Sequence, residues 1–423
     1  MTRSHLIAEN APLYDFGHAV ELYSPLLLVL VTGFVVSLLA TPLMRRLAMA
    51  NGIVDWPDAK RKAHAHPVAY LGGVAIFIGW LCGVLLYLGG VVQAPTGSAP
   101  FPVSVILGAA VIMLTGLFDD VYGIQARVKI GGQLFAAAAL ATENVGLVLV
   151  QNTFELIQLG NMPDWLVYWL GTAVIAGLVV GACNAMNLID GLDGLSSGIA
   201  GIAALGMCLI LFFFGALVDR PEAGAIAAPI MVICFALIGS LLGFLPYNFN
   251  PASIFMGDTG SLLLGFICVA VILMFGGIGG LGPLMVTAGL ICFAVPITDT
   301  TLAIIRRKLQ GRPIFAPDAM HIHHMLRRSG LGVKQAVGVM WGMGLLYAAI
   351  GVTIMALQLR WREGMAAFAV LYVVTLLIGL RTAFRQTADL KKKAAEALPE
   401  APVADADADQ PGTGKADPGA AAS

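Results

Sequence analysis

The stretch Asn184-Ala-Met-Asn187-Leu-Ile-Asp190-Gly-Leu-Asp193-Gly-Leu195 lies between two long apolar runs, residues 164–182 and 196–217. In a helix, its two amides and two carboxylates step by three residues and share about one half of the helix surface. Gly191 and Gly194 would loosen such a helix and let a ligand approach the backbone. Carboxylates this close to a bilayer are costly unless they face water, a cation or a partner. The stretch predicts a functional site at a membrane edge, although a polar loop that only joins two membrane helices has the same composition.

The composition of the chain is that of a membrane protein. Of its 423 residues, 58% are hydrophobic and only 12% are charged, whereas ordinary soluble domains carry about 25% charged residues. Six cysteines show no paired or metal-like spacing, so we expect buried, free thiols. We predict an all-α polytopic membrane protein with about eleven transmembrane helices. These lie near residues 24–43, 69–90, 102–118, 129–145, 164–182, 196–217, 225–246, 261–276, 283–303, 337–357 and 365–383.

Lysine and arginine gather in alternate loops, which sets the expected orientation in the bilayer. With the N-terminus outside and the C-terminus inside, 20 of the 24 basic residues fall on the cytoplasmic side. Residues 1–23 are then an extracytoplasmic leader and residues 24–383 the integral-membrane domain. Residues 384–423 form a cytoplasmic tail that is first basic and then disordered. Two apolar β-prone runs predict a small periplasmic β-hairpin near residues 145–159.

Further polar groups fall on the same cytoplasmic side. The pair Asp119-Asp120 suits a divalent cation or a proton acceptor, but acidic pairs are also common on ordinary surfaces. Asp258 lies between glycines before an apolar run and resembles a metal or phosphate station, whose backbone N–H groups also point at an anion. Phe255 offers a flat face to a nucleobase or serves as an interfacial anchor. The lysines and arginines around Lys62 suit phosphate binding or simply follow the topology rule.

The last cytoplasmic loop carries His321-Ile-His323-His324, after Asp299 and Arg312. No Cys or Glu accompanies the histidines at zinc-site spacing, so we favour anion and sugar contacts. Asp299 either caps or ion-pairs internally or acts in catalysis. Carboxylates that bind Mg²⁺, with cations around phosphates, are the parts that phosphoryl transfer needs. No Walker-type sequence is present, which disfavours an ATP-hydrolysing pump.

Four motifs together resemble those of the polyprenyl-phosphate N-acetylhexosamine-1-phosphate transferases, over about residues 24–383. They are Asp119-Asp120, residues 184–194, Phe255-Met-Gly-Asp258-Thr-Gly-Ser261 and His321-Ile-His323-His324. The resemblance implies transfer of N-acetylhexosamine 1-phosphate, with GlcNAc 1-phosphate expected first, from a UDP-N-acetylhexosamine to undecaprenyl phosphate, with release of UMP. It implies Mg²⁺ as the cofactor, with Mn²⁺ as a substitute, and a product that initiates a cell-surface glycan such as O-antigen. It also implies a multi-pass protein in the lipid bilayer of the bacterial inner membrane, an active site facing the cytoplasm and no nucleic-acid partner.

The resemblance also implies roles for individual residues. Catalytic roles fall to Asp119, Asp120, Asp190 and Asp258, and the metal ligands are Asn187 and Asp258. The nucleotide contacts are Asn187, Asp193, Asn248 and Phe255. The sugar and phosphate contacts are Arg312, His321, His323 and His324, and the lipid phosphate lies near Asp119, Lys129 and Lys62. The chain departs from the family pattern at Gly123, where many relatives have an acidic residue, and at Ala69, where proline is common.

Other functions remain open at this point. A phospho-MurNAc-pentapeptide transferase of peptidoglycan synthesis usually shows three consecutive histidines. A secondary transporter would carry its carboxylates near mid-bilayer in broken helices, and an intramembrane aspartyl protease would need two opposed aspartates inside the membrane. We expect direct attack of the lipid phosphate on the β-phosphorus, with a phospho-aspartate route as the rival. The sequence leaves open which N-acetylhexosamine is transferred, which glycan follows and whether the chain forms a homodimer.

Overall fold

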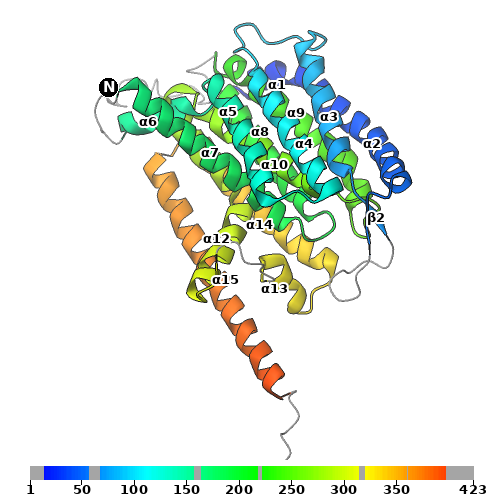
Figure 1. Cartoon of the computed structure of the whole chain (residues 1–423). Coiled ribbons are helices and arrows are strands. Elements are labelled where there is room, and N and C mark those ends of the chain that lie inside the picture. The colour runs from blue at the N-terminus through cyan, green and yellow to red at the C-terminus, as the bar shows by residue number, and fades with distance from the viewer. Residues whose placement is uncertain are drawn as a thin grey trace, which may run out of the picture.

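The computed structural model describes residues 14–56, 67–156, 163–217, 222–313, 320–359 and 361–396. Within these residues the chain folds as a bundle of long helices with two very short strands (Figure 1). The prediction of an all-α polytopic protein is therefore confirmed.

Helix α10 (Gly257–Phe275) forms the axis of the bundle, and nearly all of its side chains are buried. Glycine lets neighbouring helices approach it closely, as is common in membrane bundles. A Cβ at Gly265 would meet the backbone of Ala182 and Cys183, and a Cβ at Gly116 would meet the backbone of Thr259. The helices around α10 are α3 (Gly72–Leu88), α4 (Val103–Tyr122), α7 (Asp164–Ile189), α8 (Leu195–Gly215), α9 (Ala223–Asn248) and α11 (Gly282–Cys292).

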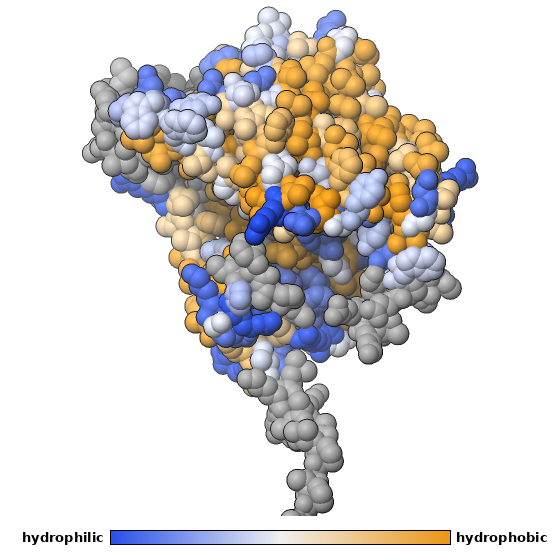
Figure 2. Space-filling model, viewed as in Figure 1, coloured by the Kyte–Doolittle hydropathy of each residue, from blue (hydrophilic) through white to orange (hydrophobic). Residues whose placement is uncertain are grey.

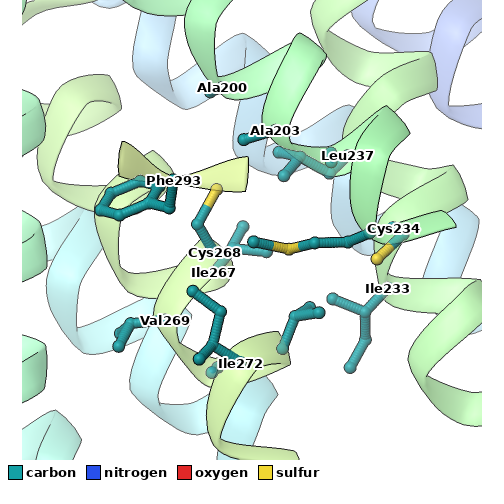
Figure 3. Close-up of a cluster of buried hydrophobic side chains, with 14 of the residues drawn as sticks. Ala200, Ala203, Ile233, Cys234, Leu237, Ile267, Cys268, Val269, Ile272 and Phe293 are labelled. Atoms are coloured by element: carbon teal, nitrogen blue, oxygen red, sulfur yellow. The ribbon is translucent and has the colours of Figure 1, made fainter. Parts of the chain in front are cut away.

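The interior between α8, α9 and α10 is apolar (Figure 3). Cys234 of α9 and Cys268 of α10 are buried among Ile233, Leu237 and Ile267. All six cysteines of the chain are free, as their spacing predicts. Five of them are buried and fill the core as small apolar residues, whereas Cys82 is half-buried.

Helix α2 (Leu27–Ala50) runs along the outside of the bundle, where it packs on α3 and α9. Its Val35, Leu39 and Leu43 step by four residues and are exposed. Large apolar side chains gathered on an outer face are unfavourable in water and favourable in hydrocarbon. Figure 2 shows hydrophobic residues over the upper part of the visible face and hydrophilic residues toward its lower end. This is the surface of a multi-pass membrane protein.

Each of the eleven predicted membrane segments lies on a helix or a helix pair, but the count of eleven spans is not confirmed. Among the described residues, eight helices are long and apolar enough to cross a membrane. A ninth span results if α11 and α12 (Ala294–Leu309), which are bent by 68°, count as one. Helices α3 and α5 (Ala126–Thr142) have only 17 residues each.

The predicted β-hairpin near residues 145–159 is wrong. Residues Leu147–Leu156 form helix α6, and residues 157–159 lie outside the described part of the chain. Leu147 and Val150 are buried and stand three residues apart, which is the spacing of one helix face. Leu147 packs against Gly171 of α7. A short apolar run does not by itself distinguish a strand from a helix, and packing on α7 selects the helix here.

Two short strands join distant loops. Strands β1 (Val54–Asp55) and β2 (Val68–Ala69) pair antiparallel, with Val54 opposite Ala69. Ala69 also bridges Ile254, and its carbonyl accepts the Phe255 N–H at 2.8 Å. The backbone before α3 therefore holds the segment that leads into α10.

The two ends of the chain differ in how they meet the bundle. Near the N-terminus, α1 (Phe16–Tyr23) and the 3₁₀ turn η2 (Ser24–Leu26) pack on α9. In the second half of the chain, another 3₁₀ turn, η3 (Gly279–Leu281), precedes α11. The C-terminal helices are α13 (Ile322–Arg328), α14 (Val333–Ala356) and α15 (Trp361–Glu396), and α15 extends beyond the bundle (Figure 1). The first part of the predicted tail, residues 384–396, continues α15. Its predicted disordered part, and residues 1–13 of the leader, lie outside the described residues.

Candidate active site

Acid and amide side chains meet where the ends of four helices come together. Asp119 lies at the end of α4, Lys129 near the start of α5, Asn187 at the end of α7 and Asp258 at the start of α10. The Lys129 ammonium lies 2.7 Å from Asp119 Oδ2 and also contacts Asp258 Oδ2. Asn187 Nδ2 donates to Asp258 Oδ1 at 2.7 Å and to Ser261 Oγ at 3.0 Å. We call Asp119, Lys129, Asn187 and Asp258 the acid–lysine cluster.

Asp120 bonds to the backbone and the threonine at the start of α10 rather than to Lys129. Its Oδ1 accepts the Asp258 N–H at 2.8 Å, and its Oδ2 accepts both the N–H and the hydroxyl of Thr259, at 2.9 and 2.5 Å. These amides are the orphan donors of the first turn of α10, where a negative charge is also favourable. The sequence predicts that backbone N–H groups near Asp258 point at an anion, and in the structure that anion is the carboxylate of Asp120. Gly257 has φ +66°, and a Cβ there would collide with the Asp120 carboxylate, so this approach requires glycine.

Asp190 follows the last residue of α7, and the charges of nearby aspartates act on it. Burial, followed by the charges of Asp258, Asp120 and Asp193, raises the pKa of Asp190 to about 8. The residue keeps some solvent exposure. The carboxyl of Asp190 therefore keeps its proton to a higher pH than an exposed aspartate does.

Asp193 holds the loop that precedes α10. Its Oδ2 accepts from Asn250 Nδ2 at 2.8 Å and from the Ala252 N–H at 3.0 Å. The two acids of the stretch quoted at the outset thus face different surroundings, although they stand only three residues apart.

Asn248 and Phe255 line the same loop with different exposure. Asn248 is buried, and its amide accepts from the Gly194 N–H at 3.2 Å and donates to the Ile254 carbonyl at 3.1 Å. It therefore acts as an internal strut between α8 and the loop before α10. Phe255 is half-buried, and its ring centroid lies 6.1 Å from that of Tyr70.

The histidine segment docks on the acidic loop. His323 is buried, and its ring lies against Gly191, where any side chain would collide with it. The ring centroids of His323 and His324 are 4.2 Å apart. Burial, followed by the neighbouring charge of His324, lowers the pKa of His323 to about 3. His323 is therefore a neutral imidazole over the physiological pH range.

The structure brings most of the predicted residues to one end of the bundle through these contacts. Arg312 is exposed in the turn after α12, where its backbone N–H donates to the backbone carbonyl of Arg307 at 2.9 Å. Lys62 lies outside the described residues. Within the described part of the chain, no group of three or more His, Cys, Asp or Glu side chains is placed to hold a metal ion on its own.

Three contributing residues escaped the sequence analysis as individuals. Thr259 and Ser261 belong to the motif quoted there, and their hydroxyls bond to Asp120 and Asn187. Gln133 is fully buried and accepts from Asn184 Nδ2 at 2.9 Å. Its position one helical turn after Lys129 was the available signal, because residues four apart share a helix face.

Comparisons with known proteins agree with this geometry. The family described as Glycosyl transferase family 4 matches residues 102–276, which include Asp119, Asn187 and Asp258. The chain is 34% identical over 325 residues to the "Probable undecaprenyl-phosphate N-acetylglucosaminyl 1-phosphate transferase" of Bacillus subtilis (strain 168), covering 75% of this chain and 83% of that protein.

Two further relatives show the breadth of the family. The "Decaprenyl-phosphate N-acetylglucosaminephosphotransferase" of Mycolicibacterium smegmatis (strain ATCC 700084 / mc(2)155) is 33% identical, over 77% of this chain and 80% of that protein. The "Phospho-N-acetylmuramoyl-pentapeptide-transferase" of Desulforudis audaxviator (strain MP104C) is 30% identical, over 77% of this chain and 97% of that protein. The chain thus belongs to the polyprenyl-phosphate N-acetylhexosamine-1-phosphate transferases of glycosyl transferase family 4, membrane phosphotransferases that place a sugar 1-phosphate on a polyprenyl phosphate.

Proposed function

We propose that this enzyme transfers GlcNAc 1-phosphate from UDP-GlcNAc to undecaprenyl phosphate and releases UMP, and that its product initiates a lipid-linked cell-surface glycan. The relatives of Bacillus subtilis and Mycolicibacterium smegmatis, which are named for N-acetylglucosamine transfer, are 33–34% identical to the chain. The relative named for the muramoyl-pentapeptide is 30% identical, and a relative from Salmonella typhi that is also named for N-acetylglucosamine transfer is 28% identical. The His321-Ile-His323-His324 form, in place of three consecutive histidines, favours the same choice. A secondary transporter is disfavoured because the acids lie at helix ends rather than in the middle of the spans.

The acid–lysine cluster is the observation that carries the proposal. The reaction must bring the phosphate of the lipid and the diphosphate of the donor together, and the repulsion between these anions is its main electrostatic problem. Lys129 supplies a fixed positive charge where α4, α5, α7 and α10 meet. Its two carboxylate partners, with Asp120 beside them, leave this place with an excess of negative charge that favours a further cation.

The side chains present fit Mg²⁺, and Mn²⁺ as a substitute. Mg²⁺ usually takes only one or two protein carboxylates and completes its shell with water and substrate phosphates, so the absence of a larger protein cage in the described residues is no obstacle. Asp258 and the side-chain oxygen of Asn187 would hold the ion, since amide oxygen and nitrogen can exchange places by a flip. When bound, the ion would neutralise the charge of the donor diphosphate.

The remaining chemistry belongs to the two phosphates and the residues that hold them. An oxygen of the lipid phosphate attacks the β-phosphorus of UDP-GlcNAc, the bond from that phosphorus to the bridging oxygen breaks, and UMP leaves with the electron pair. A phosphate monoester has its second pKa near about 6, so near neutral pH the nucleophile is mostly deprotonated without a general base. Lys129 attracts the attacking phosphate, and Asp120 keeps the start of α10 in place.

An apolar cavity supports a polyprenyl acceptor. A cavity of about 230 Å³ lies between α7, α10, α11 and α12 and is lined by residues that include Gly181, Ala185 and Phe293. The cavity reaches Ala185, near the end of α7 that also carries Asn187. A hydrocarbon chain in this cavity would place its phosphate at the polar end of the bundle. The basic loops predict that this end faces the cytoplasm of a bacterial inner membrane.

One assay tests the proposal. Purified enzyme is incubated with UDP-GlcNAc, undecaprenyl phosphate and Mg²⁺, and UMP is measured while single components are withheld. We expect UMP only when all three are present, and less product with UDP-MurNAc-pentapeptide as the donor. UMP release without the lipid, or a phosphorylated aspartate formed with UDP-GlcNAc alone, would refute direct transfer. Preference for the muramoyl-pentapeptide donor would refute the assigned sugar.

A further inference from the structure

A buried carboxylate anchors the histidine segment. Asp299 lies in α12 and is 1% exposed. Its Oδ2 is 2.7 Å from His321 Nδ1, and its Oδ1 accepts the N–H of Ile322, the first residue of α13, at 2.7 Å. Both oxygens of one side chain are therefore committed to a segment that lies more than twenty residues further along the chain.

This contact determines how the His321 ring is held. An ionised carboxylate only accepts hydrogen bonds, so the ring carries a proton on Nδ1. A carboxylate–histidine pair sets both the tautomer and the orientation of the imidazole. The His321 ring in turn stacks on that of His323, with centroids 5.8 Å apart and planes 7° apart. Asp299 thus acts on His323 through the stacked ring and through the start of α13.

The contacts of Asp299 and His321 hold the His323 ring in place beside the acidic loop. It is 1% exposed, and neither of its ring nitrogens has a hydrogen-bond partner among the described residues. Its ring lies against Gly191, in the loop between Asp190 and Asp193. Buried polar groups nearly always have partners, because leaving one unpaired costs free energy. These two nitrogens therefore point to a ligand group or an ordered water that pairs with them when the site is filled.

We propose that Asp299 is a positioning residue for the donor half of the site: it holds His321 and the start of α13, and so sets the His323 ring against Gly191 for the donor. The inference rests on the proposed function in taking UDP-GlcNAc as the donor. Asp299 touches neither substrate nor the reacting atoms, and its effect reaches the donor through His323. The acid–lysine cluster lies on other helices. Helix α12 also borders the apolar cavity proposed for the lipid, but Asp299 is not among the residues that line it, so its side chain should affect the donor first.

The test compares Asp299→Asn with Thr298→Val in the full-length enzyme. Asparagine can keep the bond from the Ile322 N–H, but it turns an N–H donor toward His321 Nδ1 and so drives the ring proton to Nε2. A bond to a charged group contributes enough to change affinity about ten- to hundredfold. We expect Asp299→Asn to raise KM for UDP-GlcNAc by this factor and to leave KM for undecaprenyl phosphate unchanged. The control Thr298 is the buried neighbour of Asp299, and its hydroxyl donates to the Ala294 carbonyl of its own helix, so Thr298→Val should keep both KM values.

Equal losses toward both substrates, or kinetics like those of the unmodified enzyme, would overturn the proposal. Two readouts need no turnover: ¹⁵N signals of labelled histidine, which report the His321 tautomer in Asp299→Asn, and hydrogen exchange of the Ile322 amide in Asp299→Ala. We expect the ring proton to move to Nε2 and the amide to exchange at least about tenfold faster; an unchanged tautomer and unchanged exchange would also overturn it. If the unmodified enzyme releases no UMP from UDP-GlcNAc, the proposed function fails, and these two readouts still decide the role of Asp299.

Discussion

Replacing Asp120 by asparagine should destabilise the start of α10, whereas the same replacement at Asp119 should not. Asp120 accepts three hydrogen bonds from the backbone of Asp258 and from Thr259. Asp119 instead pairs with the Lys129 ammonium. Asp120→Asn and Asp119→Asn are therefore a matched pair of variants: the first acts on the start of α10, and the second acts on Lys129 of α5.

The magnitude follows from the contacts. Each hydrogen bond to a charged group contributes about 1.5–3 kcal/mol, and a negative charge at a helix N-terminus adds about 0.3–1 kcal/mol. Asparagine keeps one oxygen, so it retains either the bond to the Asp258 N–H or the pair of bonds to Thr259, and it turns an N–H toward the donors of the other set. We expect the free energy of unfolding to fall by about 2–4 kcal/mol in Asp120→Asn.

The assay is thermal unfolding in detergent at one fixed scan rate, followed by tryptophan fluorescence, because membrane proteins often unfold irreversibly. The midpoint of Asp120→Asn should lie several degrees below those of the unmodified enzyme and of Asp119→Asn. Both variants should lose UMP release, since one displaces Asp258 and the other releases Lys129, so activity alone does not separate them. Equal midpoints for the two variants would refute the assignment of Asp120 to the α10 start.

Three further predictions use other features of the site. Gly257→Ala should lower both the thermal midpoint and UMP release, because alanine at φ +66° costs about 1–2 kcal/mol and its Cβ meets the Asp120 carboxylate; Gly52→Ala, at φ +69° with open space around it, is the control for backbone strain alone. His323, which lies among His321, His324 and Asp299, has a lowered pKa, so the unfolded state binds more protons than the folded state between about pH 3 and 6.5. The free energy of unfolding should therefore rise with pH across this window. Thermal midpoints measured from about pH 4 to 7 should rise less steeply in His323→Gln than in the unmodified enzyme. Chelation with EDTA should stop UMP release and added Mg²⁺ should restore it, and Asn187→Ala should require about tenfold more Mg²⁺ for half-maximal rate, whereas an unchanged requirement would remove Asn187 from the metal site.

The fold class and the positions of the polar loops between the apolar helices could be predicted from the amino-acid sequence. Transfer of a side chain between water and hydrocarbon is a property of that side chain, so runs of apolar residues mark helices whatever their neighbours are. All eleven predicted segments therefore lie on helices or a helix pair. The same local rule failed at residues 145–156, where a short apolar run suits a strand as well as a helix and contact with α7 decides.

The pairing of the polar side chains, in contrast, depends on how the helices pack. The adjacent Asp119 and Asp120 contact Lys129 and Thr259, respectively. Asp299 contacts the histidine segment through His321 rather than facing solvent. The identity of a hydrogen-bond partner depends on which helix ends the packing brings within about 3 Å, and that packing is set by glycine contacts such as that of Gly116 with the backbone of Thr259, far from it in the chain. Composition locates the acids near the membrane edge, but only the meeting of α4, α5, α7 and α10 turns them into one site.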